Sequence, residues 1–279
     1  MKSIGKPERG TIAKQGAAPK LNIKKIGIVS RDYRCKFPNG RRDFSYALPE
    51  VLKLLEGKGC DAALFSLYSI IPQESHDLRK TLTRLRLKRI RAIFMEEFQE
   101  RLKSRFQNKK RKPERYVVYH CLKGRWLEYE LHQNFDSLTG KSHSKISRFV
   151  SDEMPKRILG NCCVILCGES NGVKYSPRDT KVKDTFGLRA AIPRETNIIL
   201  NPVHDRMTRF EMKLKRQFLS EKGRWVISVW NKGKEDKNAR VRDGSGPAWT
   251  VFHNGVSNDV DLLPNALGIE IGILDVEKA

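Results

Sequence analysis

Three short apolar runs in the second half of the chain constrain its fold more than any other feature. They cover residues 158–167, 197–200 and 225–230, and each run stops at a cluster of turn-forming residues such as Gly, Asn and Pro. Continuous apolar runs of this length, bounded by turn residues, are typical of strands that are buried on both faces. We therefore predict strand, helix, strand, helix, strand across this stretch.

The first half of the chain shows a similar pattern. Residues 25–30 and 60–67 are predicted strands, and Asp43 begins a predicted helix between them. A strand, a helix and a strand within about forty residues make a βαβ unit, which implies parallel pairing. Residues 116–131 predict a β-hairpin that turns at Lys123 and Gly124.

The net charge is +23, and two segments carry most of it. Residues 1–25 hold seven Lys or Arg and one Glu, and residues 79–115 hold fifteen Lys or Arg against four Glu. Concentrated positive charge favours a polyanionic partner such as a nucleic acid. The alternative is a solvated basic surface that only keeps the protein soluble, because charge by itself does not define a site.

Composition and residue spacing predict the conformation of both basic segments. Residues 1–22 are rich in Lys, Gly, Ala and Pro, which predicts a disordered basic arm ahead of a single domain at 23–279. Residues 77–108 carry apolar side chains three or four positions apart, which predicts a long helix with one apolar face. The other faces of this helix are rich in Lys and Arg. We call residues 79–115 the basic segment.

Cysteine usage and hydropathy indicate the setting of the protein. Six cysteines without regular spacing do not make a disulfide framework, which favours a reducing, cytoplasmic location. No apolar stretch approaches the ~18 residues of a membrane span, and the N-terminus lacks the apolar core of a secretory signal. Cys162, Cys163 and Cys167 lack a Cys-x-x-Cys step and the histidines are scattered, so we predict neither a metal site nor a cofactor.

Reactive side chains lie at the ends of two of the three apolar runs: Cys167 and Glu169 at the first, and His204 and Asp205 at the second. In open α/β sheets the chemistry lies beyond the carboxyl ends of the strands, so these side chains are expected to meet. A thiol becomes a useful nucleophile when a base activates it. We predict Cys167 as the nucleophile, His204 as its base, and Glu169 or Asp205 as the carboxylate that orients the histidine. The alternative is that Cys167 is simply a small buried apolar side chain.

The order of elements and three local sequences resemble the nitrilase, or carbon–nitrogen hydrolase, superfamily. Val-Ile-Leu-Cys-Gly-Glu at 164–169 is similar to the strand that ends in the family's nucleophilic cysteine, and Asn-Ile-Ile-Leu-Asn-Pro at 197–202 to the strand and turn that follow it. Residues 223–233 and 249–255 resemble the next two strands and the loop between them. The resemblance covers about residues 23–275. It implies an α/β fold with a four-layer αββα sandwich, and a homo-oligomer.

The resemblance also implies hydrolysis of a carbon–nitrogen bond by a cysteine, a glutamate base and a lysine that stabilises the intermediate. The cysteine carries over to Cys167. The glutamate is expected where this chain has Phe-Ser-Leu-Tyr at 65–68, and the lysine where it has Glu-Leu-His-Gln at 130–133. Three functions therefore remain open. The first is thiol-dependent hydrolysis of a small-molecule amide or nitrile. The second is a non-catalytic protein of this fold that binds a ligand. The third is binding of nucleic acid or another polyanion through the arm and the basic segment.

Overall fold

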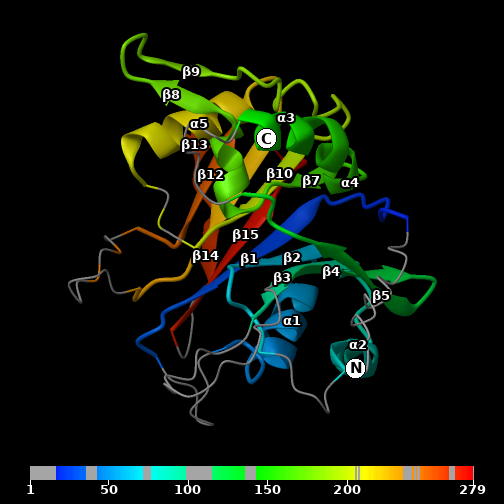
Figure 1. Cartoon of the computed structure of the whole chain (residues 1–279). Coiled ribbons are helices and arrows are strands. Elements are labelled where there is room, and N and C mark those ends of the chain that lie inside the picture. Colours follow the sequence, from blue (N-terminus) through cyan, green and yellow to red (C-terminus); the bar gives the residue numbers. More distant parts are fainter. Residues whose placement is uncertain are drawn as a thin grey trace, which may run out of the picture.

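The computed structural model of the chain describes residues 17–35, 43–71, 77–98, 115–135, 143–204, 206, 208–234, 241, 243, 246–263 and 268–278. Two β-sheets form the framework (Figure 1). The first sheet has the strand order β14-β15-β1-β2-β3-β4-β5, with β14 Asp261–Leu263, β15 Ile269–Asp275, β1 Lys25–Arg31, β2 Ala62–Phe65, β3 Ala92–Glu97, β4 Arg115–Leu122 and β5 Arg125–Leu131. The second has the order β13-β12-β11-β10-β7-β6, with β13 Val256–Asn258, β12 Trp249–His253, β11 Trp225–Val229, β10 Ile198–Pro202, β7 Cys162–Val164 and β6 Ile158–Leu159. A separate hairpin pairs β8 Lys174–Ser176 with β9 Lys181–Lys183.

The helices lie on the outer faces of the two sheets. They are α1 Leu48–Gly57, α2 Leu78–Leu85, α3 His143–Arg148, α4 Met154–Arg157 and α5 Phe210–Ser220, with a π-helical turn η1 Phe149–Glu153 and a 3-10 turn η2 Cys167–Gly172. Figure 1 shows α1 and α2 on one side of the sheets and α3 and α5 on the opposite side.

Side-chain alternation along the strands explains the layers. On β2, Leu64 faces a core that both sheets share, whereas Phe65 faces the core under α1 and α2. On β10, Leu200 belongs to the shared core, whereas Ile199 packs under α3 and α5. Since successive side chains of a strand point to opposite faces, each sheet is covered by the other sheet on one side and by helices on the other. The four-layer αββα sandwich predicted from the sequence is confirmed.

Parallel pairing places the ends of the central strands together. In the first sheet β1 pairs in parallel with β2, as the predicted βαβ unit requires. In the second sheet β10 pairs in parallel with both β7 and β11. The carboxyl ends of these three strands therefore reach the same edge of the second sheet.

The long helix predicted over 77–108 is wrong. The helix ends at Leu85, because Arg86 adopts a left-handed conformation with φ of 52°, and the chain then enters β3. Every residue of β3 is buried, since Phe94 faces the other sheet and Met95 faces the helices. A strand that is apolar on both faces has no period of two to distinguish it from a helix. Residues 99–114 of the basic segment lie outside the described residues.

The predicted boundary of the basic arm also changes. Residues 1–16 lie outside the described part of the chain, but residues 17–22 pack against the second sheet. The Leu21 amide donates to the Leu159 carbonyl at 3.3 Å, and the Asn161 amide donates to the Leu21 carbonyl at 3.1 Å. Gly160 lies between these bonds with φ of 73°, and a Cβ there would come within 2.0 Å of the Leu21 oxygen. The close approach requires glycine, so this turn and residues 17–22 belong to the folded domain. Within the described residues, no helix is long and apolar enough to cross a membrane.

Candidate active site

Cys167 lies at the edge where the parallel strands of the second sheet end. It follows β7 by three residues and begins the 3-10 turn η2. Its side chain is half-buried, whereas Cys162 and Cys163 in the strand are fully buried. Val203 and Trp230, beyond the ends of β10 and β11, form an apolar cluster against which the thiol packs. Cys167 is therefore the one cysteine of this strand region with partial access to solvent.

His204 lies near Cys167 at this edge. It follows β10, which pairs directly with β7, and its ring interacts electrostatically with the Cys167 thiol. The two side chains that the sequence predicts at neighbouring strand ends therefore lie at the same edge of the second sheet. The other predicted carboxylate at this strand end, Asp205, lies outside the described residues.

The carboxylate that faces His204 comes from the opposite sheet. His204 Nε2 lies 3.6 Å from Glu96 Oε2, an ion-pair distance longer than a hydrogen bond. Glu96 is buried near the end of β3, and the same oxygen accepts a hydrogen bond from the Tyr68 amide at 2.6 Å. The Tyr68 ring also contacts the His204 ring, with 4.4 Å between their centroids. Cys167, His204 and Glu96 therefore form a row that crosses from one sheet to the other.

The electrostatics of this row favour a protonated histidine. Burial alone lowers the pKa of His204, but the neighbouring Cys167 and Glu96 act in the opposite direction, and together they raise that pKa from 6.5 to about 10. At neutral pH the imidazole is therefore a cation between a thiol and a carboxylate. A cationic histidine next to a cysteine stabilises the thiolate form of the thiol, which is the form that attacks carbon.

Glu169 does not orient the histidine, in contrast to its predicted role. Its Oε1 accepts from the Arg157 guanidinium at 2.6 Å and from the Asn134 amide at 2.9 Å, and its Oε2 accepts from the Leu166 amide at 2.8 Å. Arg157 and Glu169 are almost completely buried, at 1% and 0% side-chain exposure. Burial raises the pKa of Glu169, and the charge of Arg157 opposes that rise. Glu169 instead anchors the turn that carries Cys167.

The residues at the positions expected for the family's glutamate and lysine have other roles. Tyr68 occupies the turn after β2, with φ of 56°, and its ring packs on His204. Leu131 at the end of the hairpin is buried in the core between the sheets. Glu96 was missed because β3 was read as helix. The available signal was an apolar run that ends in two adjacent glutamates, Glu96 and Glu97.

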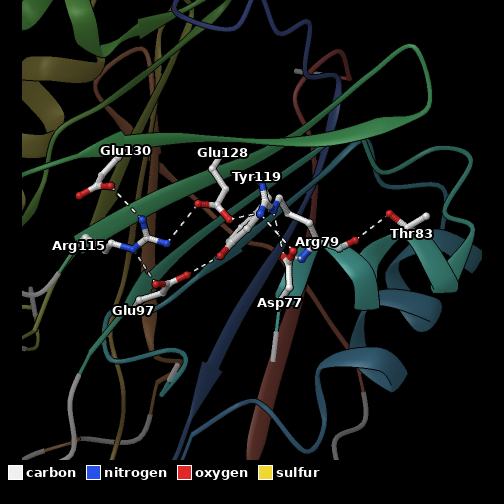
Figure 2. Close-up of polar contacts among 8 residues, drawn as sticks. All are labelled: Asp77, Arg79, Thr83, Glu97, Arg115, Tyr119, Glu128 and Glu130. Carbon is white, nitrogen blue, oxygen red and sulfur yellow. Dashed lines mark hydrogen bonds and ion pairs between the residues drawn. The ribbon is translucent and has the colours of Figure 1, made fainter. Parts of the chain in front are cut away.

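Glu97 faces the opposite side of the sheet from Glu96 and belongs to a second polar cluster (Figure 2). Arg115 pairs with Glu97 at 2.7 Å and with Glu128 at 3.2 Å, and the Tyr119 hydroxyl donates to Glu97. Burial and the charge of Glu97 raise the pKa of Tyr119. The cluster lines a cavity of about 370 Å³ between the sheet and α2. Because its charged groups are paired with one another, we interpret it as a structural network that attaches α2 to the sheet.

The part of the chain that the structure describes contains no candidate metal-binding site. No group of three or more His, Cys, Asp or Glu side chains lies close enough together there to hold a metal ion. Buried Cys163 has its thiol pKa raised to about 12 by the loss of solvation, which keeps it protonated. Among these groups, the row of Cys167, His204 and Glu96 is the arrangement suited to covalent chemistry.

Comparisons with known proteins give structural neighbours and no sequence match. No protein-family model matches the chain, and no curated protein matches it. A carbon–nitrogen hydrolase from Helicobacter pylori G27 is similar over 92% of this chain and 91% of its own, with 11% identity and a TM-score of 0.45. The C. elegans NitFhit protein is similar over 92% of this chain and 62% of its own, with 11% identity and a TM-score of 0.49. Nit3 of Saccharomyces cerevisiae, a member of branch 10 of the nitrilase superfamily, is similar over 94% and 95%, with 11% identity and a TM-score of 0.46. A function for this chain has to be argued from its own side chains.

Proposed function

We propose that this protein is a thiol-dependent hydrolase that cleaves the carbon–nitrogen bond of a small amide or nitrile. The observation that carries the proposal is the ion-pair distance of 3.6 Å between His204 Nε2 and Glu96 Oε2, at the strand end where His204 also interacts electrostatically with Cys167. A nucleophile, a proton carrier and an orienting carboxylate in this order are the three components of a catalytic triad. This set keeps the cysteine that the resemblance implies, and has His204 and Glu96 in place of the glutamate base and the lysine.

For an amide, the reaction proceeds in two halves. The Cys167 thiolate attacks the carbonyl carbon and forms a carbon–sulfur bond. His204 gives its proton to the amide nitrogen as the carbon–nitrogen bond breaks, so that an amine leaves and a thioester remains. Water then attacks the thioester carbon and loses a proton to His204, and the acid departs as the thiolate and imidazolium are restored. The Glu96 carboxylate stabilises the imidazolium in both halves.

The first test measures the reactivity of the thiol. We expect iodoacetamide to alkylate Cys167 rapidly at neutral pH, with the midpoint of the rate-against-pH profile well below the ~8.5 of a free thiol. Peptide mass mapping assigns the modified residue, and Cys167→Ala removes the signal. Cys121→Ala is the matched control, because Cys121 is also a half-buried cysteine and it lies in β4. A profile centred at the free-thiol value contradicts the proposal.

The second test measures turnover on a panel of amides and nitriles. We expect Cys167→Ala to abolish hydrolysis, and His204→Gln and Glu96→Gln to lower kcat by at least about 100-fold, the usual contribution of a proton-transfer residue. Cys121→Ala is expected to keep full activity. If Cys167→Ala keeps the activity of the wild type on a hydrolysed substrate, Cys167 is not the nucleophile.

A second candidate function is polyanion binding, which one observation favours. The segment 78–91 contains no acidic residue, and its seven Lys and Arg side chains are all exposed: Arg79, Lys80, Arg84, Arg86, Lys88, Arg89 and Arg91. Beside them, an open cavity of about 400 Å³ is lined by Arg79, Lys80, Thr83, Arg84 and Trp126. Several exposed cations along one path fit the spaced phosphates of a single-stranded nucleic acid.

Binding of a fluorescent single-stranded oligonucleotide over a series of salt concentrations tests this second function. We expect the affinity to fall steeply with salt, and Lys80→Glu with Arg84→Glu to weaken binding and to reduce the slope by about one for each lost phosphate contact. Lys145→Glu, an exposed cation of α3 in the opposite outer layer, is the matched control. Equal weakening by the control would indicate diffuse attraction to the net charge and no defined surface. Binding to anionic lipid vesicles but not to the oligonucleotide would assign the surface to membranes.

A further inference from the structure

A buried arginine that forms no ion pair with a carboxylate of the described residues lies near the candidate nucleophile. Arg216 extends from α5 into the protein and is 1% exposed. Taking a guanidinium out of water is costly, and buried cations are normally compensated by a carboxylate. In the described part of the chain, no carboxylate forms an ion pair with Arg216. Its charge therefore requires another explanation.

The acceptors that bind Arg216 among the described residues are neutral. Nη2 donates to Asn201 Oδ1 at 2.7 Å, Nε donates to Ser228 Oγ at 3.0 Å, and Nη1 donates to the Met212 carbonyl at 3.1 Å. The Asn201 amide in turn donates to the Ile165 carbonyl at 2.6 Å, two residues before Cys167. These bonds hold the guanidinium at the ends of the strands, under the turn that carries the thiol.

Four ionisable groups surround Cys167 on the elements that pack against it. His204 follows β10, and Glu96 lies behind it on β3. Arg216 and Lys215 come from α5, and Lys215 donates to Asn171 in η2 at 2.9 Å. Burial lowers the pKa of Arg216 to about 10, and the charge of Cys167 acts in the opposite direction. Arg216 is still a cation at neutral pH, and Cys167 is a neighbouring group that can carry a compensating negative charge.

We propose that Arg216 is a positioning residue that holds the charge of the Cys167 thiolate from the α5 side, opposite to His204. This inference rests on the proposed function, because it concerns the same nucleophile. Two cations from different elements would then share one anion. Arg216 would hold the thiolate before it attacks the substrate and again when hydrolysis of the thioester releases it, because Arg216 stays charged at neutral pH.

The test is the pH profile of Cys167 alkylation in three variants. Arg216→Met removes the charge and keeps most of the volume, and such replacements of buried charges are often tolerated by the fold. Arg216→Lys keeps the charge. Ser228→Ala removes one hydrogen bond of Arg216 and leaves its charge in place, so it is the matched control. We expect the profile of Arg216→Met to move upward by about one pH unit or more, a tenfold change in ionisation, and the other two profiles to stay near that of the wild type.

The outcomes separate this inference from the proposed function. A wild-type profile centred at the free-thiol value contradicts both proposals. A low wild-type midpoint that Arg216→Met leaves unchanged overturns the role of Arg216 and leaves the proposed function standing. Equal shifts in Arg216→Met and Ser228→Ala would reduce Arg216 to a packing role, which also overturns the inference. Should Arg216→Met fail to fold, Asn201→Asp places a carboxylate beside the guanidinium. An unchanged profile in that variant would likewise refute a role for the charge.

Discussion

Removal of Arg157 should strongly destabilise the protein, because it leaves the buried carboxylate of Glu169 without its cation. The pair joins α4 to the turn that carries Cys167, at an N–O distance of 2.6 Å and with 1% and 0% side-chain exposure. Breaking one partner of a buried pair costs about 3–5 kcal/mol. Glu169 keeps the hydrogen bonds from the Asn134 and Leu166 amides. We therefore expect Arg157→Met to cost about 3 kcal/mol, the lower end of that range.

The pH dependence of this cost follows from the same geometry. Burial already raises the pKa of Glu169, and Arg157 opposes the rise, so the pKa rises further in Arg157→Met. A carboxyl whose folded pKa lies above its unfolded value binds its proton more tightly in the folded state. The folded state of the variant therefore gains stability as the pH falls through the folded pKa towards the unfolded one. We expect the difference in free energy of unfolding between wild type and Arg157→Met to shrink from pH 7 to pH 5.

Urea unfolding, followed by tryptophan fluorescence and circular dichroism, measures both effects. Arg157→Met with Glu169→Gln should be less costly than the sum of the single changes by at least about 2 kcal/mol, because the double variant buries no charge at this place. Arg148→Met, which breaks an exposed pair with Asp152, is the matched control and should have no measurable effect. A small cost for Arg157→Met, or additive single changes, would refute the interpretation of Glu169 as a structural anchor.

Three further predictions concern other parts of the fold. The folded pKa of His204, about 10, exceeds the ordinary histidine value of 6.5, so its contribution to stability is complete below about pH 6.5 and is lost as the pH rises through about 10. Unfolding in urea at pH 6, 8 and 10 should show this loss in the wild type and not in His204→Gln. Gly160→Ala should cost about 2 kcal/mol or more, because Gly160 has φ of 73° and its Cβ would meet the Leu21 carbonyl. Gly124→Ala, with φ of 78° and nothing within 4 Å of its Cβ, should cost less in the same melts. Leu82→Ala should cost about 2–5 kcal/mol because Leu82 is fully buried on the inner face of α2, and an unchanged melting temperature would contradict that packing.

Much of the candidate site could be predicted from the sequence because its key residues follow parallel strands. The apolar runs identified β7, β10 and β11, and parallel pairing then places Cys167 and His204 at the same sheet edge. The turn at Lys123 and Gly124, where φ is 50° and 78°, likewise follows from local sequence. These features depend only on neighbouring strands or on a few consecutive residues. The apolar runs and the turn residues that bound them are visible in the sequence, so both kinds of feature can be predicted from it.

Only the tertiary structure decided which carboxylate lies next to the His204 imidazole. Glu169 is close to Cys167 in sequence, but Arg157 and two backbone amides take its oxygens. Glu96 is distant in sequence, and it reaches His204 because the two sheets pack face to face. The apolar pattern of a strand records that both its faces are buried, yet it carries no information about which strand of the other sheet lies opposite. That choice depends on how the side chains of the two sheets fit together, and so the row of Cys167, His204 and Glu96 exists only in the folded protein.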